Sequence, residues 1–492
     1  MEQTKRTYSR RDFLQTAAGV AGAGMLFSIQ NCETKPDFDP EAPNILILMP
    51  DQMRGMAMGC MGDPNAITPN LDALASSGVL LENTFANTPN CSSARATILT
   101  GKYAHQHGVI TNDLRLRADE TTLAEILLEQ GYDTGFIGKW HLDGGPRQPG
   151  FVPQDRRQGF EFWAANECNH DHFNSQYFRD SDNPIQINGF EVNTWTDLTL
   201  EFLGNRSQRP FFLMVSYSPP HHPYEAPKEY IQKFDPASLD MPLEWIEGEG
   251  LPTREQIAAY YANINAIDDQ IGRILQALEE SGKADKTIVL FTSDHGDMLG
   301  SHARIYDRQP WDESVQVPGI VRFPRDIPGN RTISNFFSHV DMAPTLLGLA
   351  GVEIPEAMQG FDLSPTLLGE NHQTPPSVFF QIFGPSPTRD VGGGWRGVRT
   401  GKYKYARYEN EHWVYFDFQS DQEEIINLAG YDTSGGRLNQ LHNLVERWME
   451  RTGDSWDQNF DIPLADTLEL TEQQAFTSVQ AYLDWKQKNQ PA

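Results

Sequence analysis

The segment with the most suggestive chemistry begins at Cys91 and ends at Gly101. Its residues predict a short helix with Cys91 in the first turn and Arg95 one turn later. At positions i and i+4 of one helix, these two side chains face the same side. Free N–H groups and the partial positive charge of a helix N-terminus attract tetrahedral anions. The spacing therefore indicates a nucleophile directed at an anionic substrate.

Further reactive side chains follow apolar runs that are typical of strands buried on both faces. These predicted strands cover residues 44–49, 132–138, 210–217 and 287–292. The polar residues after them are Asp51, then Lys139 and His141, then His221, and finally Asp294 and His295. In open α/β sheets, sites form at the carboxyl ends of the strands. We therefore expect all of these side chains in one site at one edge of a sheet.

Helices are predicted between the strands, as in an α/β sheet that is covered by helices. Thr68 is predicted as the N-cap of one helix, and residues 122–130 form a second. A capping box of Thr253 and Gln256 begins a long amphipathic helix that ends at Gly282. These helices would pack on the sheet and hold its strand ends in place.

Beyond residue 375 the pattern changes. Shorter antiparallel strands are predicted at 377–383, 398–408 and 412–418, followed by an amphipathic helix at 438–451. A weak helical pattern covers 474–487. We therefore predict a catalytic domain at residues 43–375 and a smaller α+β domain at residues 376–492.

Three of the reactive residues also suit a metal site. Asp51, Asp294 and His295 could bind one divalent cation together with an atom of residue 91. Carboxylates favour Ca²⁺ or Mg²⁺, whereas a histidine also allows Mn²⁺ or Zn²⁺. The residue types alone leave the identity of the cation open.

Residues 90–101 resemble the signature of the type I sulfatases, Cys/Ser-x-Pro/Ala-x-Arg followed by Leu-Thr-Gly, with Ser93 at the Pro/Ala position. The resemblance covers residues 43–428 and depends on six motifs in the family's order. It implies an α/β fold of the alkaline phosphatase superfamily, with a large mixed sheet between helices. A small C-terminal domain of antiparallel sheet and helix is also implied.

The resemblance further implies two cofactors. Cys91 would be converted to 3-oxoalanine (formylglycine) by a formylglycine-generating enzyme or an anaerobic sulfatase-maturing enzyme. The hydrated aldehyde would attack sulfur through one hydroxyl and later expel sulfate through the other. One Ca²⁺ ion is implied, with Mg²⁺ or Mn²⁺ as alternatives, and Arg95 and the cation would hold the hydrate. Pro50 occupies the position at which the family often has the first of two acids.

By resemblance, Lys139 would bind the sulfate oxygens, and His141 would be the base that drives sulfate elimination. His221 would protonate or stabilise the leaving oxygen. Since Lys139 and His141 lie two residues apart on a segment predicted to be extended, we expect their side chains to point the same way.

One position departs from the family pattern. Asp307 stands where the family usually has a lysine that helps the leaving group. Two arginines lie near it, and a guanidinium can bind sulfate through two hydrogen bonds. We predict that Arg308 takes over this role, with Arg304 as the alternative.

Other side chains are candidates for substrate contacts because polar and aromatic groups suit a sugar, although they also occur in ordinary loops. They are Lys102, His170, His172, Arg304, Trp395 and Arg396.

The resemblance predicts a sulfatase that hydrolyses sulfate esters on a sulfated carbohydrate or polysaccharide. One alternative is a phosphonate monoester or phosphodiester hydrolase of the same superfamily, which resembles this chain less at Lys139 and His141. Another alternative is an inactive protein that binds sulfated glycans.

Charge and the N-terminus indicate where such an enzyme works. The 492 residues carry a net charge of −28, which argues against nucleic acid as a partner. Arg10 and Arg11 precede an apolar run at 16–29, which predicts a twin-arginine (Tat) export signal at residues 1–32. That run is too short for a stable membrane span. We expect a periplasmic or secreted enzyme, in preference to a lipoprotein anchored at Cys32.

The cysteine count adds little to this. Four cysteines are few for an exported chain, and no disulfide framework is evident. Whether Cys60 and Cys168 pair is left open.

Overall fold

The computed structural model describes residues 36–144, 149–204, 207–384, 391–431 and 436–456. Apart from Pro36, these residues belong to one compact unit that begins at Asp37. The predicted export signal at 1–32, including Cys32, and the weak helix at 474–487 lie outside the described residues.

An eight-stranded mixed sheet forms the centre of this unit, with the strand order β10-β2-β9-β8-β1-β7-β3-β4. Strands β8, β1, β7, β3 and the edge strand β4 run parallel to one another, whereas β9 runs antiparallel between β2 and β8. The strand bounds are β1 (Asn44–Asp51), β2 (Val79–Phe85), β3 (Asp133–Lys139), β4 (Phe162–Asn166), β7 (Phe211–Pro220), β8 (Thr287–Phe291), β9 (Ile320–Arg322) and β10 (Arg331–Ser338). Strands β5 (Gln176–Tyr177) and β6 (Ile185–Gln186) form a separate hairpin.

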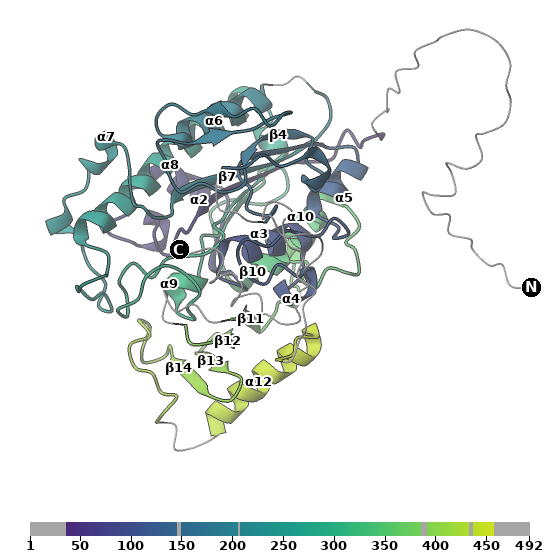
Figure 1. Cartoon of the computed structure of the whole chain (residues 1–492). Coiled ribbons are helices and arrows are strands. Elements are labelled where there is room, and N and C mark those ends of the chain that lie inside the picture. The colour runs from purple at the N-terminus through teal and green to yellow at the C-terminus, as the bar shows by residue number, and fades with distance from the viewer. Residues whose placement is uncertain (1–35, 145–148, 205–206, 385–390, 432–435, 457–492) are drawn as a thin grey trace, which may run out of the picture. The chain divides into compact units, whose positions relative to one another are not determined.

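Alternate residues of β1 pack into two different hydrophobic cores. Ile45 and Ile47 contact a core that includes residues of α3, α5 and α10, whereas Leu46 and Leu48 contact a core with residues of α2, α6 and α8. A strand that is apolar on both faces therefore lies between two layers of helices (Figure 1). These helices are α2 (Pro69–Ser77), α3 (Cys91–Thr100), α5 (Leu123–Glu129), α6 (Glu191–Leu203), α8 (Arg254–Glu280) and α10 (His339–Ala350). Shorter ones are α4 (Ala104–His107), α7 (Lys228–Ile231), α9 (Asp312–Val315) and α11 (Ser364–Leu367).

The chain end forms a second, smaller sheet of four antiparallel strands, in the order β11-β12-β13-β14. Their bounds are β11 (Ser377–Ile382), β12 (Trp395–Thr400), β13 (Tyr403–Tyr408) and β14 (His412–Asp417), and α12 (Gly436–Thr452) follows them. The ring of Trp448 on α12 stacks on Phe379 of β11. The fold class predicted above, a large mixed sheet between helices with a small α+β part, is confirmed.

Two local predictions are corrected. The segment predicted as one strand at 398–408 is a hairpin, because the Thr400 hydroxyl accepts the N–H of Tyr403 at 3.0 Å and turns the chain there. Thr68 precedes α2 but does not cap it, since its hydroxyl accepts the N–H of Gly59 instead. The capping box of Thr253 and Gln256 is confirmed.

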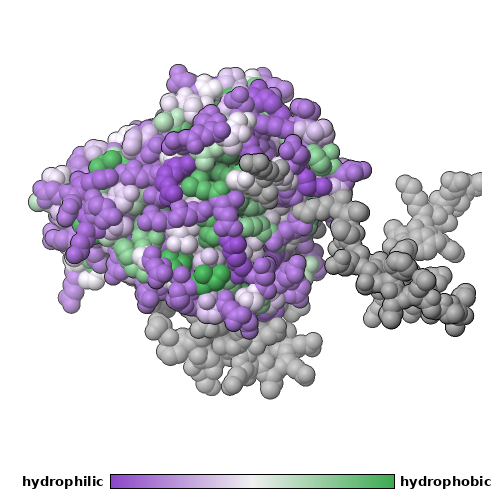
Figure 2. Space-filling view, turned by 90° about the horizontal axis from the view of Figure 1, so that it is seen from above, coloured by the Kyte–Doolittle hydropathy of each residue, from purple (hydrophilic) through white to green (hydrophobic). Residues whose placement is uncertain are grey.

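The helices, the cysteines and the surface bear on the localisation and the redox state of the protein. In the part of the chain that the structure describes, none of the helices combines the length and apolarity that a bilayer crossing requires. In the described residues Cys60, Cys91 and Cys168 carry thiols that are not in disulfides, so Cys60 and Cys168 are not joined to each other. Hydrophilic side chains cover much of the face in Figure 2, as the large acidic excess leads one to expect.

Candidate active site

The carboxyl ends of four neighbouring strands bring the sequence-predicted residues together. Asp51 ends β1 and Lys139 ends β3, while His221 follows β7 directly. Asp294 and His295 come shortly after β8, and all five side chains are buried. Because these strands are parallel neighbours, their ends meet at one edge of the sheet.

Helix α3 presents Cys91 to this edge. Asn90 caps the helix, since its side-chain oxygen accepts the N–H of Ser93 at 3.2 Å, and Gly101 ends it in the left-handed conformation. The Cys91 Sγ lies 3.2 Å from His295 Nε2 and 3.9 Å from Asp51 Oδ1. The nucleophile candidate is thus buried at a helix N-terminus.

The donor atoms of Asp51, Cys91, Asp294 and His295 all lie within 4.8 Å of one another. His295 Nδ1 lies 2.9 Å from the Gly296 carbonyl oxygen, which can only accept, so Nδ1 carries the hydrogen. The Nε2 of His295 is then the atom that is directed toward the other three donors. Two carboxylates, one imidazole and residue 91 are a donor set that fits one divalent cation.

The pKa of His295 is consistent with such an ion. Burial alone would lower the pKa of its imidazole, but the charges of Asp294 and Cys91 raise it well above the usual range. In the absence of a metal ion, the negative charges around His295 therefore favour a proton on Nε2. A divalent cation would take the place of that proton, so its binding would release protons.

Arg95 connects the two carboxylates of this cluster. Its Nη2 lies 3.0 Å from Asp51 Oδ2 and 2.8 Å from Asp294 Oδ2. Its Nη1 donates to the Lys139 carbonyl oxygen at 2.7 Å and to the Ser216 hydroxyl at 2.6 Å. Arg95 is 1% exposed, so these bonds fix the position of its guanidinium.

Lys139 adds a second buried cation, with its Nζ 2.5 Å from Asp51 Oδ2. Burial would raise the pKa of the Asp51 carboxyl, but the charges of Lys139 and Arg95 hold it below its usual range. Burial would likewise lower the pKa of Lys139, and Asp51 raises it instead. Both groups are therefore charged at neutral pH.

His141 lies on a different course from Lys139. The strand β3 ends at Lys139, and His141 has a φ of 58°. The segment from Lys139 to His141 is therefore not extended, and the reason for expecting both side chains to point the same way does not hold. The Nε2 of His141 lies 3.2 Å from Asp113 Oδ1, and its backbone N–H donates to the Glu167 carbonyl oxygen at 2.6 Å. Asp113 thus orients the imidazole that the resemblance makes the base.

His221 stacks on His170, with ring centroids 4.3 Å apart and the planes 6° apart. Its Nδ1 lies 2.7 Å from the His222 carbonyl oxygen, so Nδ1 carries the hydrogen and Nε2 has the lone pair. Burial lowers the pKa of His221 well below its usual range, and the charges of His170 and Lys139 act in the same direction. The ring is therefore neutral at pH 7.

The other candidates for substrate contact lie in different surroundings. His172 is fully buried between the His221 carbonyl oxygen at 2.8 Å and Glu191 Oε1 at 3.3 Å, so it supports the backbone of His221. Lys102 pairs with Glu120 at 2.7 Å. Arg304 lies over the ring of Trp311 at 4.7 Å.

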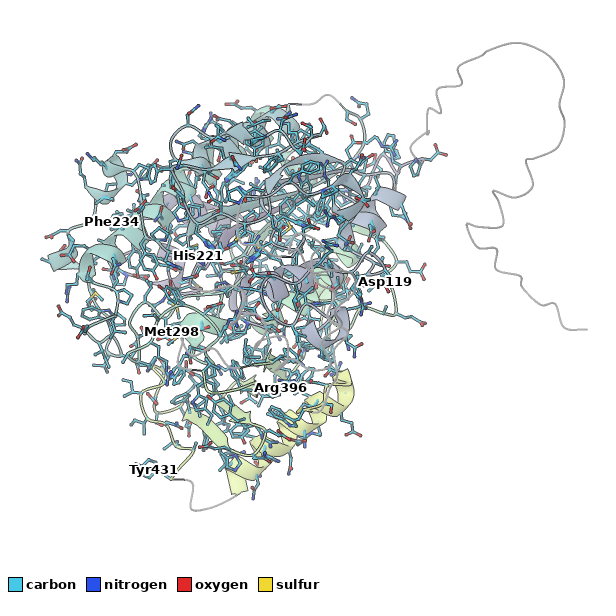
Figure 3. All side chains as sticks on the ribbon, viewed as in Figure 1. Asp119, His221, Phe234, Met298, Arg396 and Tyr431 are labelled. Atoms are coloured by element: carbon cyan, nitrogen blue, oxygen red, sulfur yellow. The ribbon has the colours of Figure 1, made fainter. Side chains whose placement is uncertain are left out.

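The C-terminal sheet holds two of the remaining candidates. Arg396 is buried in an ion pair with Asp454, and Figure 3 shows it far from His221. Trp395 is buried and donates its indole N–H to the Arg308 carbonyl oxygen at 3.0 Å. Arg308 itself has its Nε 3.9 Å from Asp307 Oδ2. These contacts make Arg396 a structural residue and give Trp395 a role in holding the loop of Arg308.

Sequence reasoning missed several polar partners in the site. They are Asp113, Glu191 and Ser216, together with the proximity of Asp307 to His295. Asp113, Glu191 and Ser216 belong to no motif and show no period, so no sequence signal identified them.

A buried nucleophile at a helix N-terminus, beside cation ligands at the edge of a mixed α/β sheet, is the arrangement of a hydrolase for anionic esters. Two family profiles match the chain: "Sulfatase" over residues 43–352, and "N-sulphoglucosamine sulphohydrolase, C-terminal" over residues 300–451. An ulvan-active sulfatase of Formosa agariphila is 34% identical over 444 residues, which are 87% of this chain and 86% of that protein. The chain belongs to the sulfatase family, whose members hydrolyse sulfate esters.

Solved structures agree with this assignment. One, in complex with its substrate D-glucosamine-2-N,6-O-disulfate, has a TM-score of 0.76 at 26% identity and covers 84% of this chain and 98% of its own. The phosphonate monoester hydrolase of Agrobacterium radiobacter has a TM-score of 0.68 at 25% identity, with 83% and 96% covered. The fold is thus shared by enzymes that act on sulfate and on phosphonate esters.

His339 is a buried histidine next to the site, and its pKa indicates how the stability of the fold depends on pH. Burial lowers the pKa of His339 to about 3, although its hydrogen bond to the Ser293 carbonyl oxygen opposes this shift. Below pH 6.5 the unfolded chain binds a proton at this residue and the folded chain does not. Its contribution to stability is therefore lost as the pH falls from 6.5 toward 3, by about 1.4 kcal/mol per pH unit at most.

We expect His339→Gln, which keeps a donor for Ser293, to reduce the acid sensitivity of folding. The difference in unfolding free energy between pH 7.5 and 5.5 should be smaller by about 1 kcal/mol than in the wild type. Urea unfolding at both pH values measures this. An identical pH dependence in the two proteins would contradict the argument.

Proposed function

We propose that this protein hydrolyses sulfate esters of a sulfated carbohydrate or polysaccharide, with formylglycine at position 91 and one bound divalent cation, Ca²⁺ being the first candidate. The observation that carries the proposal is the position of Cys91. It lies at the N-terminus of α3, 3.2 Å from His295 Nε2 and one turn from Arg95. The carbohydrate as substrate is supported by the relatives, one named for ulvan and another solved with a sulfated glucosamine.

Residue 91 is an unmodified cysteine here, and its Sγ stands where an oxygen of the matured residue would lie. When converted to formylglycine by a maturing enzyme, this residue supplies a hydrated aldehyde as nucleophile and as the group that later releases sulfate. Asp51, Asp294 and His295 would hold the cation, which supplies Lewis-acid chemistry at this position.

The chain's own side chains have complementary tasks. Arg95 and Lys139 place two permanent positive charges at the sheet edge, where a sulfate group needs them despite the net charge of −28. Asp113 orients His141 for proton transfer. The carbonyl group of His221 is held by His172, and the Nδ1–H of His221 is bound to the His222 carbonyl oxygen, so His221 can act on the leaving oxygen only after its Nε2 takes up a proton.

A substrate panel tests the function. Protein produced with a maturing enzyme should release sulfate from at least one sulfated mono-, oligo- or polysaccharide, with Cys91→Ala as the inactive control. Faster turnover of a phosphodiester or phosphonate monoester than of any sulfate ester would favour the alternative hydrolase. Tight glycan binding without sulfate release would favour a binding protein.

We also propose export through the twin-arginine route to the periplasm or the medium, supported by Arg10 and Arg11 before an apolar run. Replacing both arginines with lysine should retain the precursor in the cytoplasm, which cell fractionation measures. Equal export of the variant and the wild type would contradict this route.

A further inference from the structure

A third carboxylate, that of Asp307, lies beside the residues that would bind the metal ion. The resemblance led us to expect a lysine at this position of the loop. The Asp307 side chain is buried, with Oδ2 3.9 Å from His295 Nε2. We propose that Asp307 is a further ligand of the divalent cation. This inference depends on the cation of the proposed function and adds a ligand to its site.

The distances around His295 carry the argument. Its Nε2 lies 3.2 Å from Cys91 Sγ, 3.8 Å from Asp51 Oδ1, 3.9 Å from Asp294 Oδ1 and 3.9 Å from Asp307 Oδ2. In octahedral coordination at about 2.4 Å, adjacent donors are about 3.4 Å apart and opposite ones about 4.8 Å. The four neighbours of His295 thus lie at distances from it that are close to those of adjacent positions around one ion, and for Asp307 the contact with His295 is the one that places it beside the cation ligands.

The loop that carries Asp307 is held on both sides. The Tyr306 N–H donates to Asp297 Oδ1 at 3.1 Å, and the Arg308 N–H donates to the Pro89 carbonyl oxygen at 3.0 Å. Both Tyr306 and Arg308 have positive φ angles, of 62° and 72°. The backbone thus follows a course that side-chain-bearing residues rarely adopt, and this course brings the carboxylate to the cation site.

The charges of the site also favour a ligand here. A carboxylate next to a bound sulfate ester would repel it, unless a cation lies between them. Arg308 offsets part of the charge, with its Nε 3.9 Å from Asp307 Oδ2. Asp51, Asp294 and Asp307 are then matched in number by Arg95, Lys139 and Arg308, and a divalent cation makes the centre net positive for an anionic ester.

The position of Asp307 has a counterpart in β1. Pro50 precedes Asp51, so this strand end supplies one acid where a pair is expected from the resemblance. Asp307 restores a carboxylate to the donor set from a different loop. With Asp307 in place of the expected lysine, the neighbouring Arg308 is the cationic side chain that lies beside this position, with its Nε 3.9 Å from Asp307 Oδ2.

Cation binding by the full mature chain tests the proposal directly. In calorimetric titrations with CaCl₂ after chelator treatment, Asp307→Asn should weaken binding at least about tenfold. Asp269→Asn, an acid loss at a partly exposed ion pair with Lys233, should leave the affinity unchanged. Thermal unfolding in chelator shows that each variant is folded. The rise in unfolding temperature on adding CaCl₂ should be smaller for Asp307→Asn than for the wild type.

A second readout separates ligation from a structural effect. With Eu³⁺ in place of Ca²⁺, luminescence lifetimes in H₂O and D₂O count the coordinated waters, and Asp307→Ala, which has no side-chain oxygen left to bind the ion, should gain about one. An unchanged Ca²⁺ affinity in Asp307→Asn and an unchanged water count in Asp307→Ala, with both ions bound by the wild type, would overturn the role of Asp307 alone. Failure of the wild type to bind either ion would overturn the cation of the proposed function too.

Discussion

Replacing Cys91 with alanine is expected to abolish sulfate-ester hydrolysis, with a loss in kcat of about 10⁴-fold or more, as for other nucleophile deletions. The physical reason is that the helix N-terminus, the cation ligands and Arg95 all converge on this one side chain. Among the described residues, the group that could hold a metal ion includes one thiol or hydroxyl side chain, that of Cys91. Sulfate release from the best substrate of the panel measures the effect.

The control for this change is Cys60→Ala. Cys60 is a free thiol beside Asp72, where burial and that carboxylate raise its pKa to about 12 and make it a poor nucleophile. Its replacement should leave kcat within about twofold of the wild type. Equal activity of Cys91→Ala and the wild type would rule out residue 91 as the nucleophile.

The mass of the Cys91 peptide adds a measurement that does not depend on a substrate. After coexpression with a maturing enzyme, we expect the peptide to have lost the thiol and gained an aldehyde. Ser93, which stands at the Pro/Ala position of the signature, has its N–H bound to the Asn90 side chain at the start of α3. A peptide that keeps its thiol would leave the proposed reaction without a nucleophile and favour the glycan-binding alternative.

The strand ends could be predicted from the sequence because the inner strands are apolar on both faces. Continuous runs of this kind identify β1 and β7 without any knowledge of their partners, and parallel order places their carboxyl ends together. The order of the strands does not follow from these runs. The strand β9, only three residues long and antiparallel, was not predicted at all.

The polar contacts that complete the site could not be predicted for a different reason. Asp113 pairs with His141 across 28 positions, and His172 contacts Glu191 across 19, with no periodic pattern between them. The left-handed backbone at His141 is also a product of its tertiary hydrogen bonds, because a histidine alone does not favour positive φ. Sequence patterns identify the elements, whereas long-range pairing decides which loop residues meet.

Arg95 shows how stability and function depend on the same contacts. Its guanidinium donates to both Asp51 and Asp294, and it also holds the Lys139 carbonyl group. Removing it would leave two buried carboxylates with less compensation. Breaking a buried pair of this kind costs about 3–5 kcal/mol.

We therefore expect Arg95→Met to lose activity and about 3–5 kcal/mol of unfolding free energy in chelator, with a smaller loss in CaCl₂ because the cation offsets the same carboxylates. Urea unfolding in both conditions measures this. Arg396→Met is the matched control: it breaks a buried pair with Asp454 away from the site, so its loss should be equal in chelator and in CaCl₂. If the loss in Arg95→Met were also independent of Ca²⁺, the two carboxylates that Arg95 joins could not be ligands of one ion.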